Sequence, residues 1–171
     1  MYARLRPYHL IGAIGGFLTV LTAIISLAVS TSYYISAEWV IIVNMLLIGS
    51  NGLIATYFFG AFSASRDSLI KVGSLIAGIG LGFNVLISIL QMAGVYVFVL
   101  ALLGALVMMA GVVIACIKFI MLFQRDAFVV VLCVFIFLGL LLSLFWTWAS
   151  LISGAGLGGL LIYFYVHNIT Y

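Results

Sequence analysis

The chain is 171 residues long, 68% of its residues are hydrophobic, and only 5% are charged. Soluble domains contain about 45–50% apolar and about 25% charged residues, so this composition excludes a water-soluble fold and predicts an integral membrane protein. The formal net charge is +3, from six basic and three acidic residues. A spanning helix takes about 20 residues, so the chain has room for five or six spans.

Apolar runs separated by short polar breaks predict an all-α bundle of six transmembrane helices in a single domain, residues 1–171. The last apolar stretch, residues 127–165, is too long for one helix at about 1.5 Å per residue across a core of about 30 Å. We expect it to divide near residues 150–154, and five spans is the alternative if the last segment is re-entrant. The predicted helices are at about residues 9–30, 39–62, 70–92, 95–118, 127–149 and 153–167.

The first two predicted helices combine small and polar residues. Gly12 and Gly16 lie one turn apart on the first helix, and Ser26 follows near its far end. The second helix carries Asn44 and Asn51, which are seven residues apart and therefore share one face. Small residues let helices approach closely in a membrane, so we expect helix packing at the two glycines.

The third predicted helix has the clearest pattern, because one of its faces changes from small residues to polar ones along its length. This face consists of Gly73, Ala77, Gly80, Asn84, Ser88 and Gln91. A second stripe of small residues lies beside it and consists of Ser74, Gly78 and Gly82. Both stripes predict close contact with neighbouring helices. Asp67 precedes this helix, and its carboxylate is expected to cap the free amides of the first turn.

The remaining helices carry fewer signals. Ala93 and Gly94 predict a tight turn into the fourth helix, and the apolar residues 119–123 are expected to continue that helix. The sixth helix is rich in glycine, and Gly154 and Gly158 are expected to pack against a neighbour.

The basic residues predict the orientation, because on the six-span topology all of them fall on one side of the membrane. They are Arg4, Arg6, Arg66, Lys71, Lys118 and Arg125. The positive-inside rule places this side, with both termini, in the cytoplasm. The positive net charge is therefore explained by the orientation of the chain in the cell membrane, and we expect no nucleic-acid partner.

Other residues fit the same frame. Trp39, Trp146 and Trp148 fall at the opposite boundary, as an interfacial aromatic belt does. Arg6, Arg66 and Arg125 each precede an odd-numbered helix, at separations of 60 and 59 residues. The six helices are therefore either three repeated hairpins or three unrelated hairpins of similar length.

Seven polar residues within the spans lie in the half away from the basic side. They are Ser26, Asn44, Asn84, Ser88, Gln91, Ser143 and Thr147. A polar group that faces lipid costs several kcal/mol, so these side chains should face one another or a wet cavity. They either bond across helices and fix the packing, which we favour, or line an outward vestibule that binds a small polar solute.

The sequence carries no pattern of an active site. No aspartate or glutamate lies within a predicted span, which disfavours proton-coupled transporters, intramembrane proteases and carboxylate-bridged metal sites. Without a set of nucleophile, base or metal ligands, we expect no enzyme and no cofactor. His9 and His167 are weak candidates for metal or haem ligands, and we expect them to be ordinary interfacial residues without a metal. Cys116 and Cys133 lack the spacing of a metal or redox motif and are expected to be buried small hydrophobic residues.

Two functions are consistent with these features. The favoured one is a small, non-enzymatic structural or accessory subunit of a larger membrane complex, in contact with lipid and with other membrane subunits or copies of itself. In span number, size and cytoplasmic termini, however, the chain resembles the membrane-embedded substrate-binding subunits of energy-coupling-factor vitamin transporters. This likeness is architectural and covers the whole length. It implies the alternative function, binding or transport of a small solute.

Overall fold

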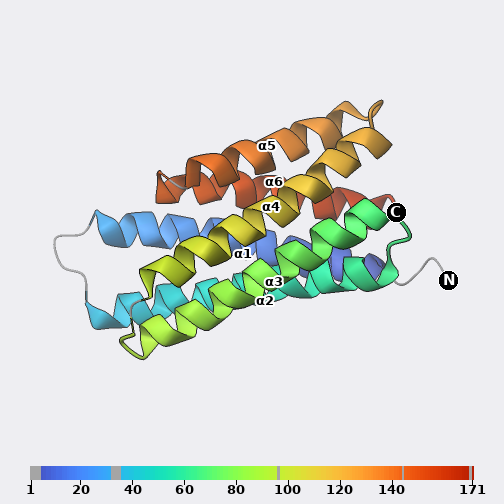
Figure 1. Ribbon diagram of the computed structural model, residues 1–171. Helices are drawn as coiled ribbons and strands as arrows, with labels where there is room; N and C mark the ends of the chain where they lie inside the picture. The colour runs from blue at the N-terminus through green and yellow to red at the C-terminus, as the bar shows by residue number, and fades with distance from the viewer. Residues whose placement is uncertain (1–4, 32–35, 96, 144, 170) are drawn as a thin grey trace.

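The computed structural model describes residues 5–31, 36–95, 97–143, 145–169 and 171. The predicted all-helical bundle is confirmed, with six α-helices in this part of the chain (Figure 1). They are α1 (Arg6–Ser30), α2 (Ala37–Ala64), α3 (Ser68–Met92), α4 (Phe98–Leu122), α5 (Ala127–Ser143) and α6 (Ser150–Val166), with a 3-10 turn, η2 (Thr147–Ala149), before α6. The helices α1 to α4 are long and apolar enough to cross a membrane, and α5 and α6 are shorter apolar helices of 17 residues.

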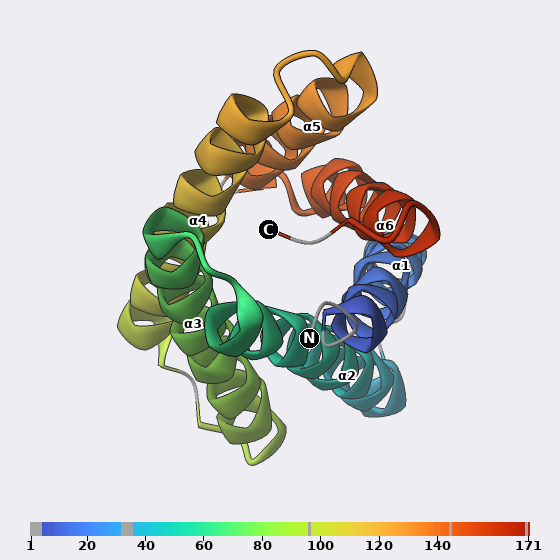
Figure 2. The same ribbon diagram turned by 90° about the vertical axis from the view of Figure 1, so that its right-hand side faces the viewer.

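The six helices stand in a ring. Each helix packs against the next one in sequence, and α6 closes the ring against α1 (Figure 2). The contact between α4 and α5 is the sparsest of the six, and these two helices diverge from the turn that joins them (Figures 1 and 2).

The two ends of the ring differ in composition. We call one end the basic end, because Arg6, Arg66, Lys71, Lys118 and Arg125 lie there in the helix ends and loops. We call the other end the tryptophan end, because Trp39, Trp146 and Trp148 lie there at the start of α2 and in the turn before α6.

Close backbone contacts hold neighbouring helices together. A Cβ atom added to Gly111 of α4 would overlap the backbone of Ala77 and Gly73 in α3. In the same way, a Cβ atom on Gly16 of α1 would overlap the backbone of Gly158 in α6. Of the residues expected to pack, those at helix contacts are Gly12, Gly16, Gly73, Ala77, Gly78, Gly154 and Gly158.

Gly82 differs from this expectation. It is exposed, and an added Cβ atom would have nothing within 4 Å. Gly82 lies on the same face of α3 as Ile79, Phe83 and Leu86, which are 43%, 45% and 51% exposed. The contacts of α3 with α4 lie on another face of the helix, at Gly73, Ala77 and Gly80.

The boundaries of the later helices also differ from the predicted ones. α5 ends at Ser143 and not near residue 149, and α4 spans 98–122 where 95–118 was predicted. α5 stops early because the chain turns back after Leu142, whose carbonyl accepts from the amides of Phe145 and Trp146. This turn stacks the rings of Trp146 and Trp148 at a centroid distance of 6.1 Å. The predicted continuation of α4 through residues 119–122 is confirmed.

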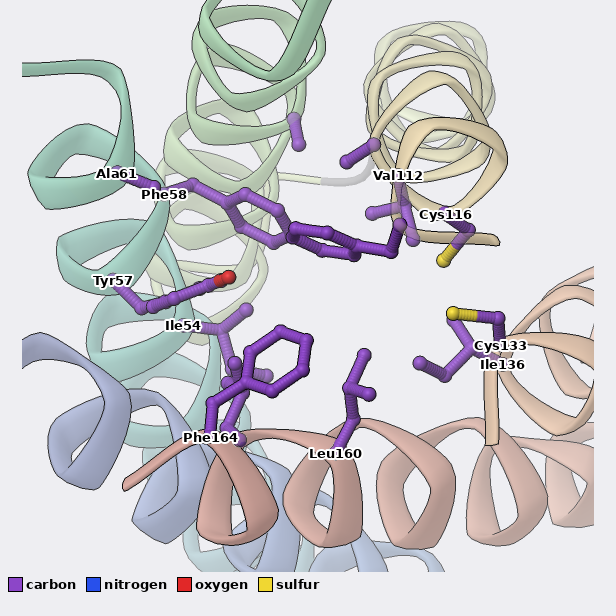
Figure 3. Packing of buried hydrophobic residues seen from close by; sticks show 14 of the residues in the cluster. Ile54, Tyr57, Phe58, Ala61, Val112, Cys116, Cys133, Ile136, Leu160 and Phe164 are labelled. Carbon is purple, nitrogen blue, oxygen red and sulfur yellow. The ribbon is translucent and has the colours of Figure 1, made fainter. Parts of the chain in front are cut away.

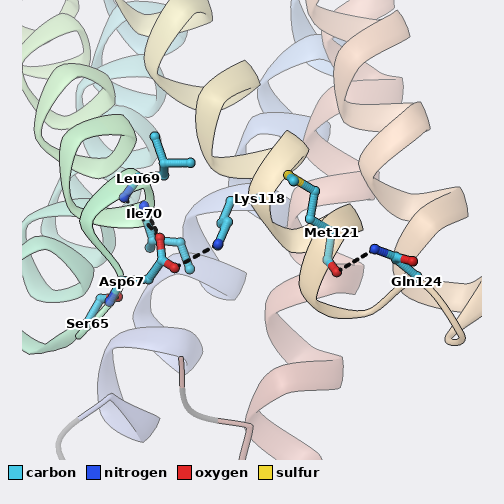
Figure 4. A network of polar contacts seen from close by, with 7 residues as sticks. All are labelled: Ser65, Asp67, Leu69, Ile70, Lys118, Met121 and Gln124. Atoms are coloured by element: carbon cyan, nitrogen blue, oxygen red, sulfur yellow. Dashed lines mark hydrogen bonds and ion pairs between the residues drawn. The ribbon is translucent and has the colours of Figure 1, made fainter.

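The predicted cap of α3 is confirmed at the basic end. The carboxylate of Asp67 accepts from the amides of Leu69, at 2.9 Å, and Ile70, at 3.2 Å (Figure 4). It also pairs with Lys118 of α4 at 2.9 Å. The hydrogen bond from Lys118 and those from the two amides hold the pKa of Asp67 below its ordinary value of 3.8. Asp67 thus joins the start of α3 to the end of α4.

Replacing Gly111 with alanine should lower the free energy of unfolding by about 1–3 kcal/mol, because α3 and α4 must separate to admit the methyl group. The measurement is a titration with denaturing detergent in mixed micelles, followed by circular dichroism. Gly82→Ala is the matched control on the open face of α3. It should unfold no earlier than the wild type, since alanine is the better helix former. Equal losses for both variants would contradict close packing as the cause.

Replacing Asp67 with asparagine should remove a pH-dependent part of the stability. Because the pKa is lowered in the folded state, the stabilisation is present above the ordinary value of 3.8 and is lost as the pH falls through the lowered value. Asp67→Asn keeps a capping oxygen and loses the ion pair, so at neutral pH it should lose about 0.2–1 kcal/mol.

The control for this prediction is Asp67→Ala, which also loses the cap and should lose about 1 kcal/mol more. Unfolding titrations at neutral pH and near pH 3 measure both effects. The difference between wild type and Asp67→Asn should shrink in acid, and a difference that stays constant would exclude the ion pair as its source.

Candidate functional site

The ring of helices surrounds a partly open cavity of about 310 Å³ that extends from the middle of the bundle toward the tryptophan end. All six helices contribute to its wall. The polar side chains that line it are Thr19, Asn51, Asn84, Ser88, Ser143, Ser150 and Ser153. The rest of the wall is mainly leucine, isoleucine, methionine, valine and phenylalanine, and no charged residue of the described chain lines the cavity. Small-ligand sites have volumes of about 300–1,000 Å³, and this cavity falls at the lower end of that range.

Two amides in the cavity wall have hydrogen-bonding capacity to spare. The Nδ2 atom of Asn84 in α3 lies 3.9 Å from the Sδ atom of Met108 in α4, and a thioether is a weak acceptor. The side chain of Asn51 in α2 makes no recorded hydrogen bond within the described residues. Both side chains are partly exposed to this space, so a ligand or water in the cavity can supply the hydrogen-bond partners that the protein does not.

Four hydroxyl groups of the cavity wall donate within their own helices. Ser88 donates to the carbonyl of Asn84 at 2.9 Å, and Ser143 donates to that of Leu140 at 2.7 Å. Thr19 and Ser153 do the same with carbonyls three or four residues earlier. Each hydroxyl oxygen can still accept a hydrogen bond. The cavity therefore offers amide donors together with hydroxyl and amide acceptors.

The structure brings three of the expected polar residues together in this cavity, Asn84, Ser88 and Ser143. Ser26, Asn44 and Gln91 are not in its wall, and Asn44 is buried with its amide bonded to the carbonyl of Val40 at 3.0 Å. The side chain of Thr147 lies outside the described part of the chain.

Sequence reasoning did not place four further residues in this site: Thr19, Asn51, Ser150 and Ser153. The signal for Asn51 was present, since it lies seven residues after Asn44 on one face of α2. It lies nearer the middle of its helix than Asn44, and the cavity reaches deeper than the polar half of the predicted spans.

Between the cavity and the basic end, the ring is filled by large side chains. Phe58, Val112 and Ile136 belong both to the cavity wall and to the buried core, and they form the floor of the cavity. Beyond them, side chains from α2, α4, α5 and α6 point toward one another (Figure 3). Cys116 and Cys133 are part of this layer, and both are free and buried, as predicted.

The two histidines were both expected to be interfacial, and for His9 this was wrong, because the aromatic side chains around its ring bury it. His9 is fully buried, its Nε2 atom is 3.2 Å from the hydroxyl of Tyr171, and its Nδ1 atom has no hydrogen-bond partner among the described residues. His167 is exposed, and its ring lies 3.0 Å from the carbonyl of Tyr163. The described residues contain no group of three or more histidine, cysteine or acidic side chains placed to hold a metal ion.

No family model, no curated protein and no solved structure matches this chain. Function is therefore inferred from the chemistry of the site, as the fold alone does not determine it. The cavity is uncharged, mostly apolar, and supplied with a few convergent amides and hydroxyls. These are the features of a pocket that binds a small neutral molecule.

Proposed function

We propose that this chain is a non-enzymatic, multi-pass membrane protein that binds a small neutral molecule in its central cavity. The observation that carries the proposal is the pair of amides, Asn51 and Asn84, in the wall of a cavity of about 310 Å³. Among the described residues, the only partner of either amide is a methionine sulfur at 3.9 Å. A cluster that served packing alone is expected to bond across the helices and to leave no cavity between them.

The wall of the cavity defines the class of ligand. A charged ligand would lie in a largely apolar space without an opposite charge, and an unpaired buried charge is strongly unfavourable. We infer a ligand with an apolar body and one or two groups that hydrogen-bond to amides, such as a hydroxyl, carbonyl or carboxamide. Its body would lie against Leu81, Ile87 and Leu157.

We further propose that all six helices span the cell membrane, with the basic end in the cytoplasm. The positive-inside rule supports this orientation, and so do the tryptophans at the opposite end. The cavity then lies in the outer half of the membrane. A solute-binding component of a transport system fits this arrangement, in keeping with the architectural likeness to energy-coupling-factor subunits.

An accessory role in a larger complex is the second candidate. Phe98 and Phe145, at the tryptophan end, are 79% and 75% exposed, more than the other large apolar side chains of the described chain. Such side chains fit contact with another membrane subunit, with a further copy of the chain, or with lipid. Purification as a monomer that binds a small molecule would count against this role.

The test uses leucine, which has nearly the shape of asparagine and lacks its amide. Purified protein is screened by thermal shift with a panel of neutral and charged small molecules. Neutral compounds that raise the melting temperature of the wild type should bind Asn51→Leu and Asn84→Leu about tenfold or more weakly, because the cavity amides are lost.

Asn44→Leu is the matched control, since Asn44 is an asparagine of the same bundle whose amide bonds to its own helix away from the cavity. It should bind those compounds as the wild type does. Binding that all three variants weaken equally, or a panel in which only charged compounds bind, would contradict the proposed site.

A further inference from the structure

The chain turns back on itself after α6. The amides of His167 and Ile169 bond to the carbonyls of Tyr163 and Phe164, and Asn168 adopts a left-handed conformation with a φ of 49°. This turn sends the chain toward the axis of the ring, and Figure 2 shows its C-terminal end at the centre of the basic end. Tyr171 therefore lies inside the ring.

Tyr171 occupies a site that fits a phenol. Its ring packs against Phe119 of α4 at a centroid distance of 4.8 Å, and against His9 of α1 and Phe164 of α6 at 5.7 Å each. Its hydroxyl shares a hydrogen bond of 2.5 Å with the hydroxyl of Tyr57 in α2 and lies 3.2 Å from Nε2 of His9. We call these four residues, His9, Tyr57, Phe119 and Phe164, the tyrosine seat.

The polar atoms of the seat depend on this occupant. Tyr57 is 1% exposed and His9 is fully buried, so water reaches neither of them freely. If Tyr171 left, both would lose the hydrogen bonds that it makes, and buried polar groups without partners are unfavourable. The seat therefore holds Tyr171 by its hydroxyl as well as by its ring, and a free phenol could replace it.

The seat lies directly below the layer that contains the two cysteines. Phe119 and Phe164 belong both to the seat and to the buried core, and Cys116 lies one turn of α4 before Phe119. Cys116 is 5% exposed and Cys133 is 1% exposed. On the far side of this layer is the floor of the cavity, which includes Val112 of α4.

We propose that Tyr171 is a displaceable plug, a phenol carried by the chain itself, which closes the basic end of the ring beneath the cavity. The seat binds phenols as a class and accepts a free phenol when Tyr171 is absent from it. That the plug covers the cytoplasmic side of the core layer below the cavity rests on the proposed function and orientation, whereas the binding of a phenol in the seat does not.

The experiment uses the two native cysteines as reporters of an open basic end. The full-length protein in detergent is treated with a water-soluble maleimide, and the rate of labelling is measured by mass spectrometry. In the wild type both thiols should react slowly. In Tyr171→Ala they should react about tenfold or more faster, because the hydrogen bonds and ring contacts that hold the plug are lost.

Para-cresol, a free phenol, should return labelling of Tyr171→Ala to the wild-type rate and raise its melting temperature. Toluene has the same shape without the hydroxyl and should do neither. Tyr171→Phe keeps the ring and should label at an intermediate rate. Tyr165→Ala is the matched control, because Tyr165 lies at the same end of α6 and its ring packs under Arg6. Among the described residues, the side chain of Tyr165 makes no hydrogen bond or ring contact with Tyr171. It should label as slowly as the wild type.

Two results would overturn the plug. One is labelling of Tyr171→Ala at the wild-type rate, and the other is fast labelling that para-cresol does not slow, which would mean general loosening of the bundle. The proposed function fails separately. Suppose that no neutral compound binds at Asn51 and Asn84 while para-cresol still protects the cysteines. Phenol binding in the tyrosine seat is then supported, and the proposed binding of a small molecule in the cavity is contradicted.

Discussion

Backbone contact at small residues sets the geometry of this ring. Helices in a membrane gain little from burying apolar side chains against one another, so their association depends on close packing and hydrogen bonds. Gly111 meets the backbone of α3, Gly16 meets that of α6, and Gly139 of α5 meets the backbone of Ser153 in α6. No glycine in the described part of α4 or α5 meets the other helix in this way, and these two helices diverge. The contacts lie between neighbours around the ring, which leaves its axis to be filled by side chains or left open.

The side chains that point toward the axis differ between the two halves of the ring. Toward the tryptophan end, the inward residues are small or amide-bearing, such as Ser88, Ser153 and Asn84, and they leave a cavity. Toward the basic end, they are large and apolar, and Tyr171 adds a further aromatic ring from outside the helices. The same six helices thus surround a cavity toward the tryptophan end and a packed hydrophobic core toward the basic end.

Much of the fold could be predicted from the sequence, because a lipid environment forces every backbone amide and carbonyl into helices. Six apolar helices followed from composition and length, and the cap at Asp67 followed from its position before an apolar run. The end of α5 did not follow, since the stretch from Ala127 to Tyr165 contains no proline, and the turn forms through hydrogen bonds to the carbonyl of Leu142 that no residue type signals. For the site, the pattern on α3 led to Asn84 and Ser88. The position of Tyr171 could not be predicted from the sequence, because its partners Tyr57 and His9 lie 114 and 162 residues away along the chain.

The unequal lengths of the helices have a consequence for the surrounding lipid. At about 1.5 Å per residue, the 25 residues of α4 extend about 37 Å, whereas the 17 residues of α5 extend about 26 Å. On the proposed orientation, α5 is about 4 Å shorter than a hydrocarbon core of about 30 Å, so the bilayer has to thin beside it. The apolar residues of α4 that precede Lys118 are long enough to match that core. Each ångström of such mismatch costs a fraction of a kcal/mol, which is enough to sort proteins among membranes of different thickness. With α5 and α6 spanning as proposed, the bilayer would therefore have to be thinner beside this short wall than beside the four longer helices.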